Sequence, residues 1–342
     1  MERWNSKTYN EDISILASEI QSLRGSVLVT GATGLIGTCI IDVLLKSNEL
    51  REQKINIYAL GRKRERYEML FGEKCKEMIW VGQDICDELK IEKDIDYIIH
   101  TSSNADPVSY SKYPAETILT NVIGTKNVLD YVKKHGAARV LFTSTIEVYG
   151  KCNIDEYVED DLGIIDFNSV RSGYPESKRI AELLCRSYME EYDIDVVMVR
   201  LPSVYGPTMK EDDSKAHAEF IRNGIRGEDI LLKSKGEQCR TYCYVMDTVS
   251  GIFKVLFDGK KGEVYNIANK DSVTTIADFA QTVAKVCGTS VISGLPSEIE
   301  KKGYSKPQNC ILDTHKIEAL GWKGKYSLLT GIKNTIDVLK EN

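Results

Sequence analysis

The sequence contains few of the residues that build metal sites and disulfide frameworks. Its 342 residues include only four histidines, and its nine cysteines are scattered, without a CxxC pair or a zinc-binding spacing. An odd, scattered set of thiols is typical of proteins that stay reduced in a cytoplasm. We therefore expect no metal site, no disulfide framework and a cytoplasmic location.

An excess of positive charge and long apolar runs are also missing. The formal net charge is −6, and the densest basic run, GRKRER at 61–66, is short. No apolar run approaches the roughly 18–20 residues that cross a bilayer, and MERWNSKTYNED at the start lacks the apolar core of a signal peptide. We expect neither nucleic acid nor a membrane as a partner. The composition, 42% hydrophobic and 28% charged, indicates a soluble globular protein.

Short apolar segments alternate with amphipathic ones over the first 200 residues. Six segments are predicted as strands: SVLVT at 26–30, INIYALG at 55–61, MIWVGQDI at 78–85, IDYIIHTSS at 95–103, ARVLFTST at 138–145 and IDVVMVRLPSVYG at 194–206. Helical spacing predicts helices over 9–23, 38–47, 114–136 and 172–192. The alternation indicates an α/β fold, a Rossmann-like doubly wound parallel sheet with helices on both faces.

Beyond residue 205 the alternation loosens. Helices are predicted over 214–228, 272–288 and 327–341, and 230–245 is predicted as a hairpin or as short strands. His217, near the start of the first of these helices, is expected to be solvated. We expect two domains: residues 1–200, with a return segment at about 240–270, and a smaller C-terminal α/β domain made mainly of residues 201–342.

The turn GATGLIG at 31–37 places three glycines between a predicted strand and a predicted helix. Gly31, Gly34 and Gly37 permit a tight turn and a close approach of the backbone to a ligand. The helix N-terminus then offers free N–H groups and a positive dipole end to a pyrophosphate. This strand–turn–helix context is the one that a dinucleotide site requires. The other candidate cofactor contacts in this turn are Thr33, Leu35 and Ile36.

The end of the second predicted strand lacks the acidic residue that usually holds the ribose 2′-hydroxyl of NAD. Gly61 and Arg62 stand there instead. An arginine at this position is able to hold the 2′-phosphate of NADP or to stack on adenine. The sequence therefore leaves NAD and NADP as alternatives.

The segment GYPESK places Tyr174 and Lys178 four residues apart, on one face of a predicted helix. A tyrosine has a pKa of about 10, so a role as base near neutral pH requires a drop of roughly 3 units, or about 4 kcal/mol. A neighbouring ammonium and a cationic nicotinamide ring are charges that act in this direction. The pair is a candidate proton-transfer site.

The ordered motifs GATGLIG, GQDI, HTSSNADP, TNVIGT, TSTIEVYG, YPESK, RLPSVYGP and GEQCRTYCYV resemble those of the extended short-chain dehydrogenase/reductases, the NAD-dependent epimerase/dehydratase family that modifies nucleotide sugars. The resemblance spans roughly residues 25–340. It implies an NAD(P)-binding first domain and a substrate-binding second domain. It also implies that Thr145 supplies a hydroxyl, that Tyr174 is the base and that Lys178 assists it.

The same resemblance assigns further contacts. Asp84 and Ile85 correspond to the positions that hold the adenine, and Arg240 to an arginine that contacts the diphosphate or the acidic end of the sugar. The other implied cofactor contacts are Thr101, Ser102, Ser103, Asn121 and Leu201. Substrate contacts are implied for Ser103, Thr145, Ser203 and Arg240. A homodimer through the helices at 115–134 and 173–192 is a further expectation from the family.

The segment TSTIEVYG narrows the reaction. Family members oxidise the sugar, usually at C4, and differ in the step after this oxidation. The 4,6-dehydratases resemble STDEVYG here, most 4-epimerases SSSAVYG and the decarboxylases STSEVYG. Ile146 leaves the dehydratase acid position empty, whereas Glu147 is unlike a plain 4-epimerase. The best match, supported by RSGYPESKRIAE, is UDP-glucuronate decarboxylase.

Several alternatives stay open. A nucleotide-sugar 4-epimerase and a 4,6-dehydratase that uses only Glu147 share the first step, and a sensor that binds NAD(P) without turnover is a distant third. Ser203 replaces a usual asparagine, and Ile146 replaces the serine of the decarboxylases. If the strand persists, alternation places Thr145 and Glu147 toward the substrate and Ile146 away from it.

Overall fold

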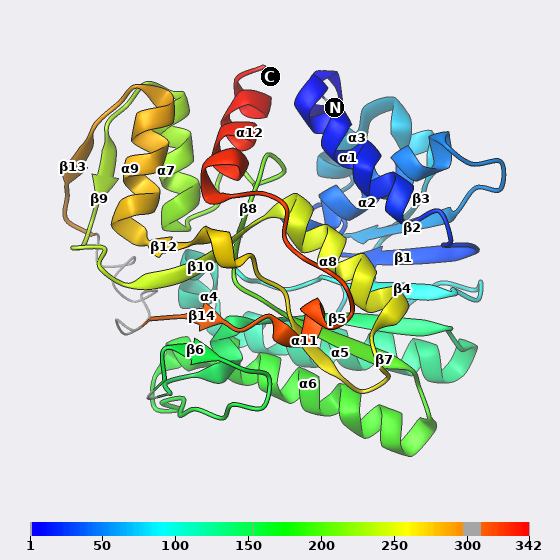
Figure 1. The fold of residues 1–342 in the computed structure, drawn as a ribbon. Helices are drawn as coiled ribbons and strands as arrows, with labels where there is room; N and C mark the ends of the chain where they lie inside the picture. Colours follow the sequence, from blue (N-terminus) through cyan, green and yellow to red (C-terminus); the bar gives the residue numbers. More distant parts are fainter. Residues whose placement is uncertain (1, 153, 297–308, 342) are drawn as a thin grey trace.

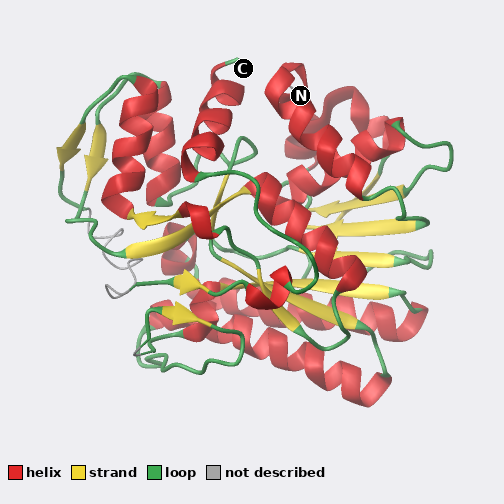
Figure 2. Cartoon of the chain, viewed as in Figure 1, coloured by secondary structure: helices red, strands yellow, loops and turns green. Residues whose placement is uncertain are grey.

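The chain folds around a parallel seven-stranded sheet in the order β11-β7-β5-β4-β1-β2-β3 (Figures 1 and 2). The structure, a computed structural model, describes residues 2–152, 154–296 and 309–341. The strands are β1 Ser26–Thr30, β2 Asn56–Gly61, β3 Ile79–Gly82, β4 Tyr97–His100, β5 Arg139–Thr145, β7 Val196–Leu201 and β11 Val264–Asn266. The Rossmann-like doubly wound α/β fold predicted from the sequence is confirmed.

Helices cover both faces of this sheet, which explains why β1 and β7 are buried along their whole length. Val27 and Val29 pack into the core beneath α1, α2 and α8, whereas Leu28 packs into the core of the opposite face. The helices of the first face are α1 Lys7–Glu19, α2 Leu35–Glu49 and α8 Val245–Asp258, and those of the second are α5 Pro114–His135 and α6 Gly173–Tyr192.

A smaller set of elements packs beside the sheet. β10 Cys239–Tyr244 lies between β8 Ser203–Tyr205 and β12 Val273–Thr275, and β9 Ile230–Leu232 pairs with β13 Val291–Ser293. The helices here are α7 Ala216–Ile225, α9 Ile276–Cys287 and α12 Leu328–Lys340. The core of the first face continues into these elements through Tyr205, Tyr242 and Phe279. Residues 297–308 of the predicted second domain lie outside the described residues.

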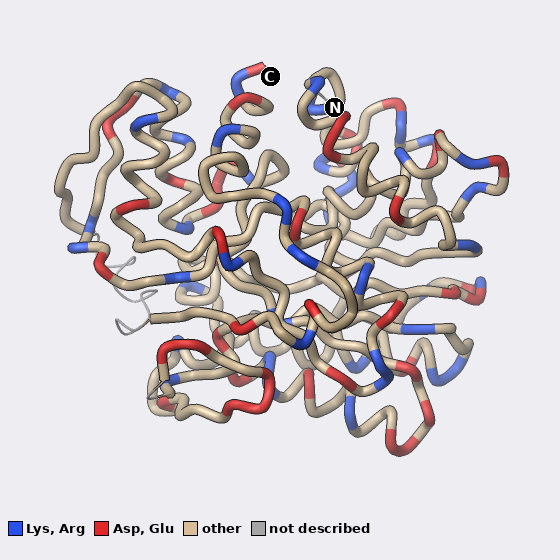
Figure 3. The backbone as a smooth tube through the Cα atoms, in the orientation of Figure 1, with Lys and Arg blue, Asp and Glu red and all other residues tan. Residues whose placement is uncertain are grey.

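The remaining elements are short. Strand β6 Glu156–Tyr157 pairs with β14 Ile311–Leu312, which comes near the end of the chain. Short helices are α3 Arg64–Phe71, α4 Pro107–Lys112 and α11 His315–Glu318. Acidic and basic residues are interspersed over nearly all of these elements (Figure 3). None of the helices in the described part of the chain combines the length and the apolar character that a bilayer crossing requires.

Of the two alternatives predicted for 230–245, the short strands are confirmed and the hairpin is not, because β9 and β10 join different sheets. Two other predictions need correction. The predicted strand 194–206 is two strands, since Pro202 separates β7 from β8 and carries the chain from one sheet to the other; proline supplies no N–H for a ladder bond. The predicted strands also omitted β11, which pairs with β7 at the edge of the main sheet after α8.

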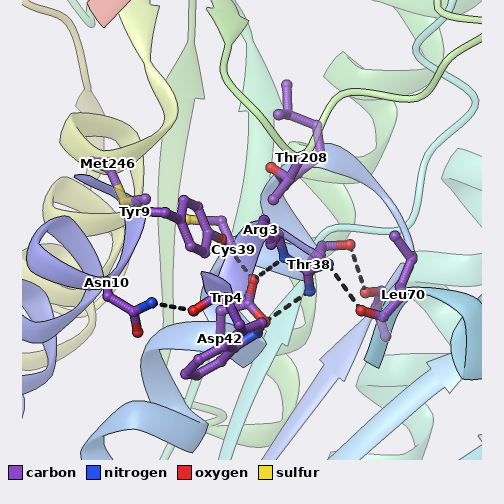
Figure 4. A network of polar contacts seen from close by, with 12 residues as sticks. Arg3, Trp4, Tyr9, Asn10, Thr38, Cys39, Asp42, Leu70, Thr208 and Met246 are labelled. Atoms are coloured by element: carbon purple, nitrogen blue, oxygen red, sulfur yellow. Dashed lines mark hydrogen bonds and ion pairs between the residues drawn. The ribbon is translucent and has the colours of Figure 1, made fainter. Parts of the chain in front are cut away.

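The N-terminal segment is fixed to α2 by a buried carboxylate (Figure 4). Asp42, which is fully buried, accepts hydrogen bonds from Arg3 Nε at 2.6 Å, Arg3 Nη2 at 2.9 Å, Trp4 Nε1 at 3.1 Å and the Tyr9 hydroxyl at 2.6 Å. Arg3 Nη1 also donates to the Leu70 carbonyl at 2.9 Å. The leading helix, predicted over 9–23, thus belongs to an N-terminal clamp on the helix that follows the glycine turn.

Candidate active site

A cavity of about 960 Å³ opens where the C-terminal ends of the central strands meet the smaller sheet. Ligands of doubly wound sheets bind at this edge. The segments after β1, β4, β5 and β7 contribute to its wall, together with the start of α6 and strand β10. The predicted site residues that line it are Gly34, Leu35, Ile36, Gly37, Thr101, Ser103, Thr145, Glu147, Tyr174, Lys178, Leu201, Ser203 and Arg240.

Seven other predicted cofactor contacts lie outside the lining of this cavity, as far as the described residues define it: Gly31, Thr33, Arg62, Asp84, Ile85, Ser102 and Asn121. Asn121 stands behind the wall, where its Oδ1 accepts from Ser103 Oγ at 2.8 Å and its Nδ2 donates to Ser177 Oγ at 2.9 Å. It therefore fixes Ser103 against α6. Ile85 packs under Gly124 of α5, where an added Cβ would stand 2.9 Å from Ile85 Cγ2.

The glycine turn fits a dinucleotide pyrophosphate. Gly31 has a φ of +68°, and a Cβ there would stand 2.9 Å from the Ser102 backbone nitrogen, so only glycine suits this position. Gly34 caps α2 without a side-chain hydrogen bond, and the first turn of the helix lines the cavity. Its N–H groups and positive dipole end are thus directed to a ligand. No group of three or more potential metal-binding side chains occurs among the described residues.

Tyr174 and Thr145 come from neighbouring elements. Thr145 is the last residue of β5, and Tyr174 lies in the first turn of α6 with only 7% of its surface exposed. Burial and the charge of Glu147 raise the pKa of Tyr174 above its usual value, against the lowering effect of Thr145, Arg171 and Ser103. The net effect of the protein on the pKa of Tyr174 is therefore opposite to the lowering that a basic role for this tyrosine requires.

Lys178 is buried beneath the same wall. Its Nζ donates to the Thr143 carbonyl at 2.8 Å and lies 4.7 Å from the centre of the Phe142 ring. Burial lowers the pKa of Lys178 to about 8, although the charge of Glu182 opposes this shift. The ammonium group is thus held in place by the carbonyl at the end of β5, on the same helix face as Tyr174.

Glu147 reaches the cavity by a different geometry from the one expected. β5 ends at Thr145, and Ile146–Tyr149 form a 3-10 helix whose N-cap is the Thr145 hydroxyl, which accepts from the Glu147 N–H at 3.3 Å. The strand on which the predicted alternation depended does not continue, so Ile146 lines the cavity together with Thr145 and Glu147. Glu147 Oε1 accepts from Arg171 Nη2 at 2.9 Å, while Oε2 is buried with no hydrogen-bond partner among the described residues.

Two residues that the sequence analysis did not single out, Tyr110 and Arg171, contact Tyr174 and Glu147. Tyr110 of α4 stacks on Tyr174, with ring centres 5.1 Å apart and planes inclined by 14°. The Arg171 guanidinium lies 5.6 Å from the Tyr110 ring centre, with Nη2 3.5 Å from the Tyr110 hydroxyl. Glu147 therefore contacts Arg171, Arg171 contacts Tyr110, and Tyr110 contacts Tyr174. In the sequence, Arg171 stands three residues before Tyr174 and begins RSGYPESKRIAE, the segment that supported the decarboxylase match.

Arg240 of β10 lines another part of the cavity. Lys215 and Lys233 line it as well, but each of them pairs with a carboxylate that also lines the cavity. His217 is buried and not solvated as expected, and its Nε2 donates to the Val204 carbonyl at 3.2 Å. Burial lowers the pKa of His217 to about 4, so the imidazole is neutral at physiological pH. Arg240 suits an anionic group such as a diphosphate or a carboxylate.

The sheet order, the glycine turn and the cavity at the strand ends define a Rossmann-like dinucleotide-binding enzyme. Residues 27–268 match the model of the NAD dependent epimerase/dehydratase family, and the chain belongs to this family. It is 34% identical to UDP-glucuronic acid decarboxylase 3 of Arabidopsis thaliana, over 90% of this chain and 86% of that protein. It is 31% identical to UDP-glucuronic acid decarboxylase 1 of Xenopus tropicalis, over 93% and 73%.

Solved structures share the fold. The dTDP-glucose 4,6-dehydratase DesIV of Streptomyces venezuelae, with NAD and TYD bound, has a TM-score of 0.79 and 26% identity over 93% of this chain and 97% of that chain. The UDP-glucuronic acid 4-epimerase of Bacillus cereus, in complex with UDP-glucuronic acid and NAD, has a TM-score of 0.77 and 24% identity over 92% and 99%. One fold therefore serves proteins named for different reactions.

Proposed function

We propose that this enzyme uses NAD(P) to modify a nucleotide sugar through a transient 4-keto sugar, and that the reaction is the decarboxylation of UDP-glucuronate or a close relative. The observation that carries the proposal is that Tyr174 and Arg240 line one cavity. This pairing suits a sugar that has a hydroxyl to oxidise and a carboxylate to bind. The similarity to UDP-glucuronic acid decarboxylases along nine tenths of the chain supports the same substrate.

The reaction begins with proton removal at the sugar. Tyr174 takes the proton of the C4 hydroxyl, and the Thr145 hydroxyl positions that group beside it. Bound NAD(P)⁺ supplies the hydride acceptor, and its positive charge favours the tyrosinate that the protein alone disfavours. Lys178 holds the cofactor ribose from the carbonyl at the end of β5. The Thr145, Tyr174 and Lys178 roles are those that the family resemblance implied.

Decarboxylation then requires little further help. A ketone at C4 makes a C6 carboxylate part of a β-keto acid, which loses CO₂ readily, so an acid at Ile146 is unnecessary. Arg240 would bind the carboxylate, and a proton from solvent would take the place of the lost CO₂ at C5. Glu147 pairs with Arg171, and its second oxygen, which lacks a protein partner among the described residues, accepts a hydrogen bond from a substrate hydroxyl. The reduced cofactor would then return the hydride to the product ketone, which completes the cycle.

Product mass distinguishes the candidate reactions. We expect UDP-glucuronate to lose the mass of CO₂ when it is incubated with the enzyme and cofactor, while UDP-glucose and UDP-N-acetylglucosamine are unchanged in mass. Mass spectrometry of the sugar nucleotides provides the measurement. Loss of water would identify a 4,6-dehydratase, and a new isomer of equal mass would identify a 4-epimerase. No turnover of any UDP-, GDP-, CDP- or dTDP-sugar, despite tight cofactor binding, would indicate a sensor.

A homodimer through α5 and α6 is the assembly that we propose. Ile118 and Leu119 of α5 and Ile180 and Leu183 of α6 are 37–63% exposed, which is unusual for so many large apolar side chains on two adjacent helices. We expect Leu183→Glu to convert the dimer into a monomer in multi-angle light scattering, because it places a charge at an apolar interface. Met69→Glu on α3 changes a side chain of equal exposure, 62% against 63%, and should leave the dimer intact. A monomeric wild-type chain would contradict the proposal.

A cytoplasmic location agrees with the thiols. All nine cysteines are free; Cys39 and Cys185 are buried among apolar side chains, and Cys243 is buried as well. Proteins of oxidising compartments usually pair such residues in disulfides. We therefore propose that the enzyme works in a reducing compartment.

A further inference from the structure

Three arginines, Arg62, Arg64 and Arg66, follow β2 in the segment GRKRER, and they differ in their partners. Within GRKRER, Arg62 pairs with Asp84 at 3.5 Å and with Glu116 at 3.3 Å, and Arg64 pairs with Glu68 at 2.8 Å. Both charges are therefore already compensated by neighbouring carboxylates. Arg62, the predicted phosphate contact, is thus engaged by Asp84 and Glu116.

Arg66 has a different environment. It lies in α3, and its Nε donates to the carbonyl of Thr33 in the glycine turn at 3.1 Å. In the part of the chain that the structure describes, Arg66 forms no ion pair. The bond through Nε fixes the plane of the guanidinium beside the turn and leaves its two Nη groups for another acceptor, as bidentate phosphate recognition requires.

A second cation lies near Arg66. Thr208 donates to the Leu35 carbonyl at 2.8 Å, so Lys210, two residues further along the chain, lies near the start of α2. Partial desolvation of the exposed Lys210 lowers its pKa, and the positive charge of Arg66 adds to this effect, against the opposing charges of Asp212 and Asp213. Two neighbouring cations that repel one another are stabilised by an anion between them.

The end of β2 excludes the carboxylate that NAD-specific sites use. A Cβ at Gly61 would stand 2.8 Å from Trp80 Cη2, because the indole lies across the end of β2. Trp80 is held there by stacking on Tyr67, with ring centres 4.5 Å apart. An acidic side chain at position 61 would therefore require the indole to move, and no acid is available to bind a ribose 2′-hydroxyl from that position.

We propose that Arg66, assisted by Lys210, receives the 2′-phosphate of NADP, so that this chain prefers NADP to NAD. The inference rests on the proposed dinucleotide site at the glycine turn and specifies which dinucleotide fills it. A charge-assisted pair of hydrogen bonds to the phosphate should favour NADP⁺ over NAD⁺ by about tenfold or more.

Equilibrium binding tests the preference without turnover. The full-length protein, freed of bound nucleotide, is titrated calorimetrically with NADP⁺, NAD⁺, adenosine 2′,5′-bisphosphate and 5′-AMP. We expect the 2′-phosphorylated member of each pair to bind about tenfold more tightly, by the charge-assisted hydrogen bonds that Arg66 donates. Arg66→Gln should abolish this difference and leave NAD⁺ affinity unchanged, and Lys210→Gln should reduce it. Arg64→Gln, a neighbour paired with Glu68, is the matched control and should alter neither affinity.

Each other outcome overturns the inference in a recognisable way. Equal or tighter binding of NAD⁺ by the wild type removes the preference itself. Equal weakening of both dinucleotides by Arg66→Gln assigns Arg66 to the pyrophosphate and not to the 2′-phosphate. Failure of both dinucleotides to bind the folded protein would reject the dinucleotide site and the proposed function together with the inference.

Discussion

Replacement of Tyr174 by phenylalanine is expected to lower turnover by about 10²–10⁴-fold, the contribution of a positioned general base. The hydroxyl is buried in the cavity, and Thr145 and Ser103 are the hydroxyl groups that act on it. Phenylalanine keeps the ring and its stacking on Tyr110, so the fold and the cofactor site should be retained. The loss should therefore appear in kcat, while the dissociation constant of the cofactor stays the same.

Cofactor reduction in a single turnover, followed by absorbance, measures this loss directly. Tyr110→Phe is the matched control. It removes the Tyr110 hydroxyl, which lies 3.5 Å from Arg171 Nη2, and leaves Tyr174 in place. This variant should lower turnover much less than Tyr174→Phe does. Since the tyrosinate is the active form and the protein raises the pKa of Tyr174, kcat/KM of the wild type should rise with increasing pH. Near-normal turnover by Tyr174→Phe would refute the mechanism.

The sequence predicted those parts of the fold that have a local signal. β1 and β7 are largely apolar runs, and α5 ends in a basic turn followed by Gly136, so their positions followed from periodicity and caps. The boundary between β10 and α8 had no such signal. β10 ends at Tyr244 and α8 begins at Val245, without an intervening glycine or proline. Strand β11 was missed for the same reason, since the preceding helix was not recognised.

The site was predictable only where it follows from chain order. Thr145 ends a strand and Tyr174 begins the next long helix, and consecutive elements of this fold are neighbours in space. The contacts of Arg171 with Glu147 and Tyr110 depend on how the loop before α6 and helix α4 meet, which no periodicity encodes. Arg66 was overlooked because nothing in the sequence distinguishes it from Arg62 and Arg64. Their different partners depend on the direction in which α3 leaves the sheet.

The largest effect on stability is expected at Asp42, far from the chemistry. Asp42→Ala should lower the free energy of unfolding by about 3–5 kcal/mol, the usual effect of removing one partner of a buried ion pair. The variant leaves the Arg3 guanidinium buried without its carboxylate, and the Trp4 indole N–H and the Tyr9 hydroxyl without their acceptor. Urea denaturation followed by circular dichroism gives the change from the midpoint and slope.

A double variant shows whether the loss of stability in Asp42→Ala comes from leaving Arg3 buried without a partner or from losing the ion pair itself. Arg3→Leu/Asp42→Leu removes both charges, so it should recover part of the stability, but not all, because Trp4 and Tyr9 still lack a partner. Glu68→Gln breaks the exposed Arg64–Glu68 pair and should cost only about 0.3–0.5 kcal/mol. If Asp42→Ala unfolds at the wild-type midpoint, the clamp contributes nothing. If the double variant is no more stable than the single one, the indole and phenol bonds, and not the ion pair, hold the N-terminal segment on the helix that begins at the glycine turn.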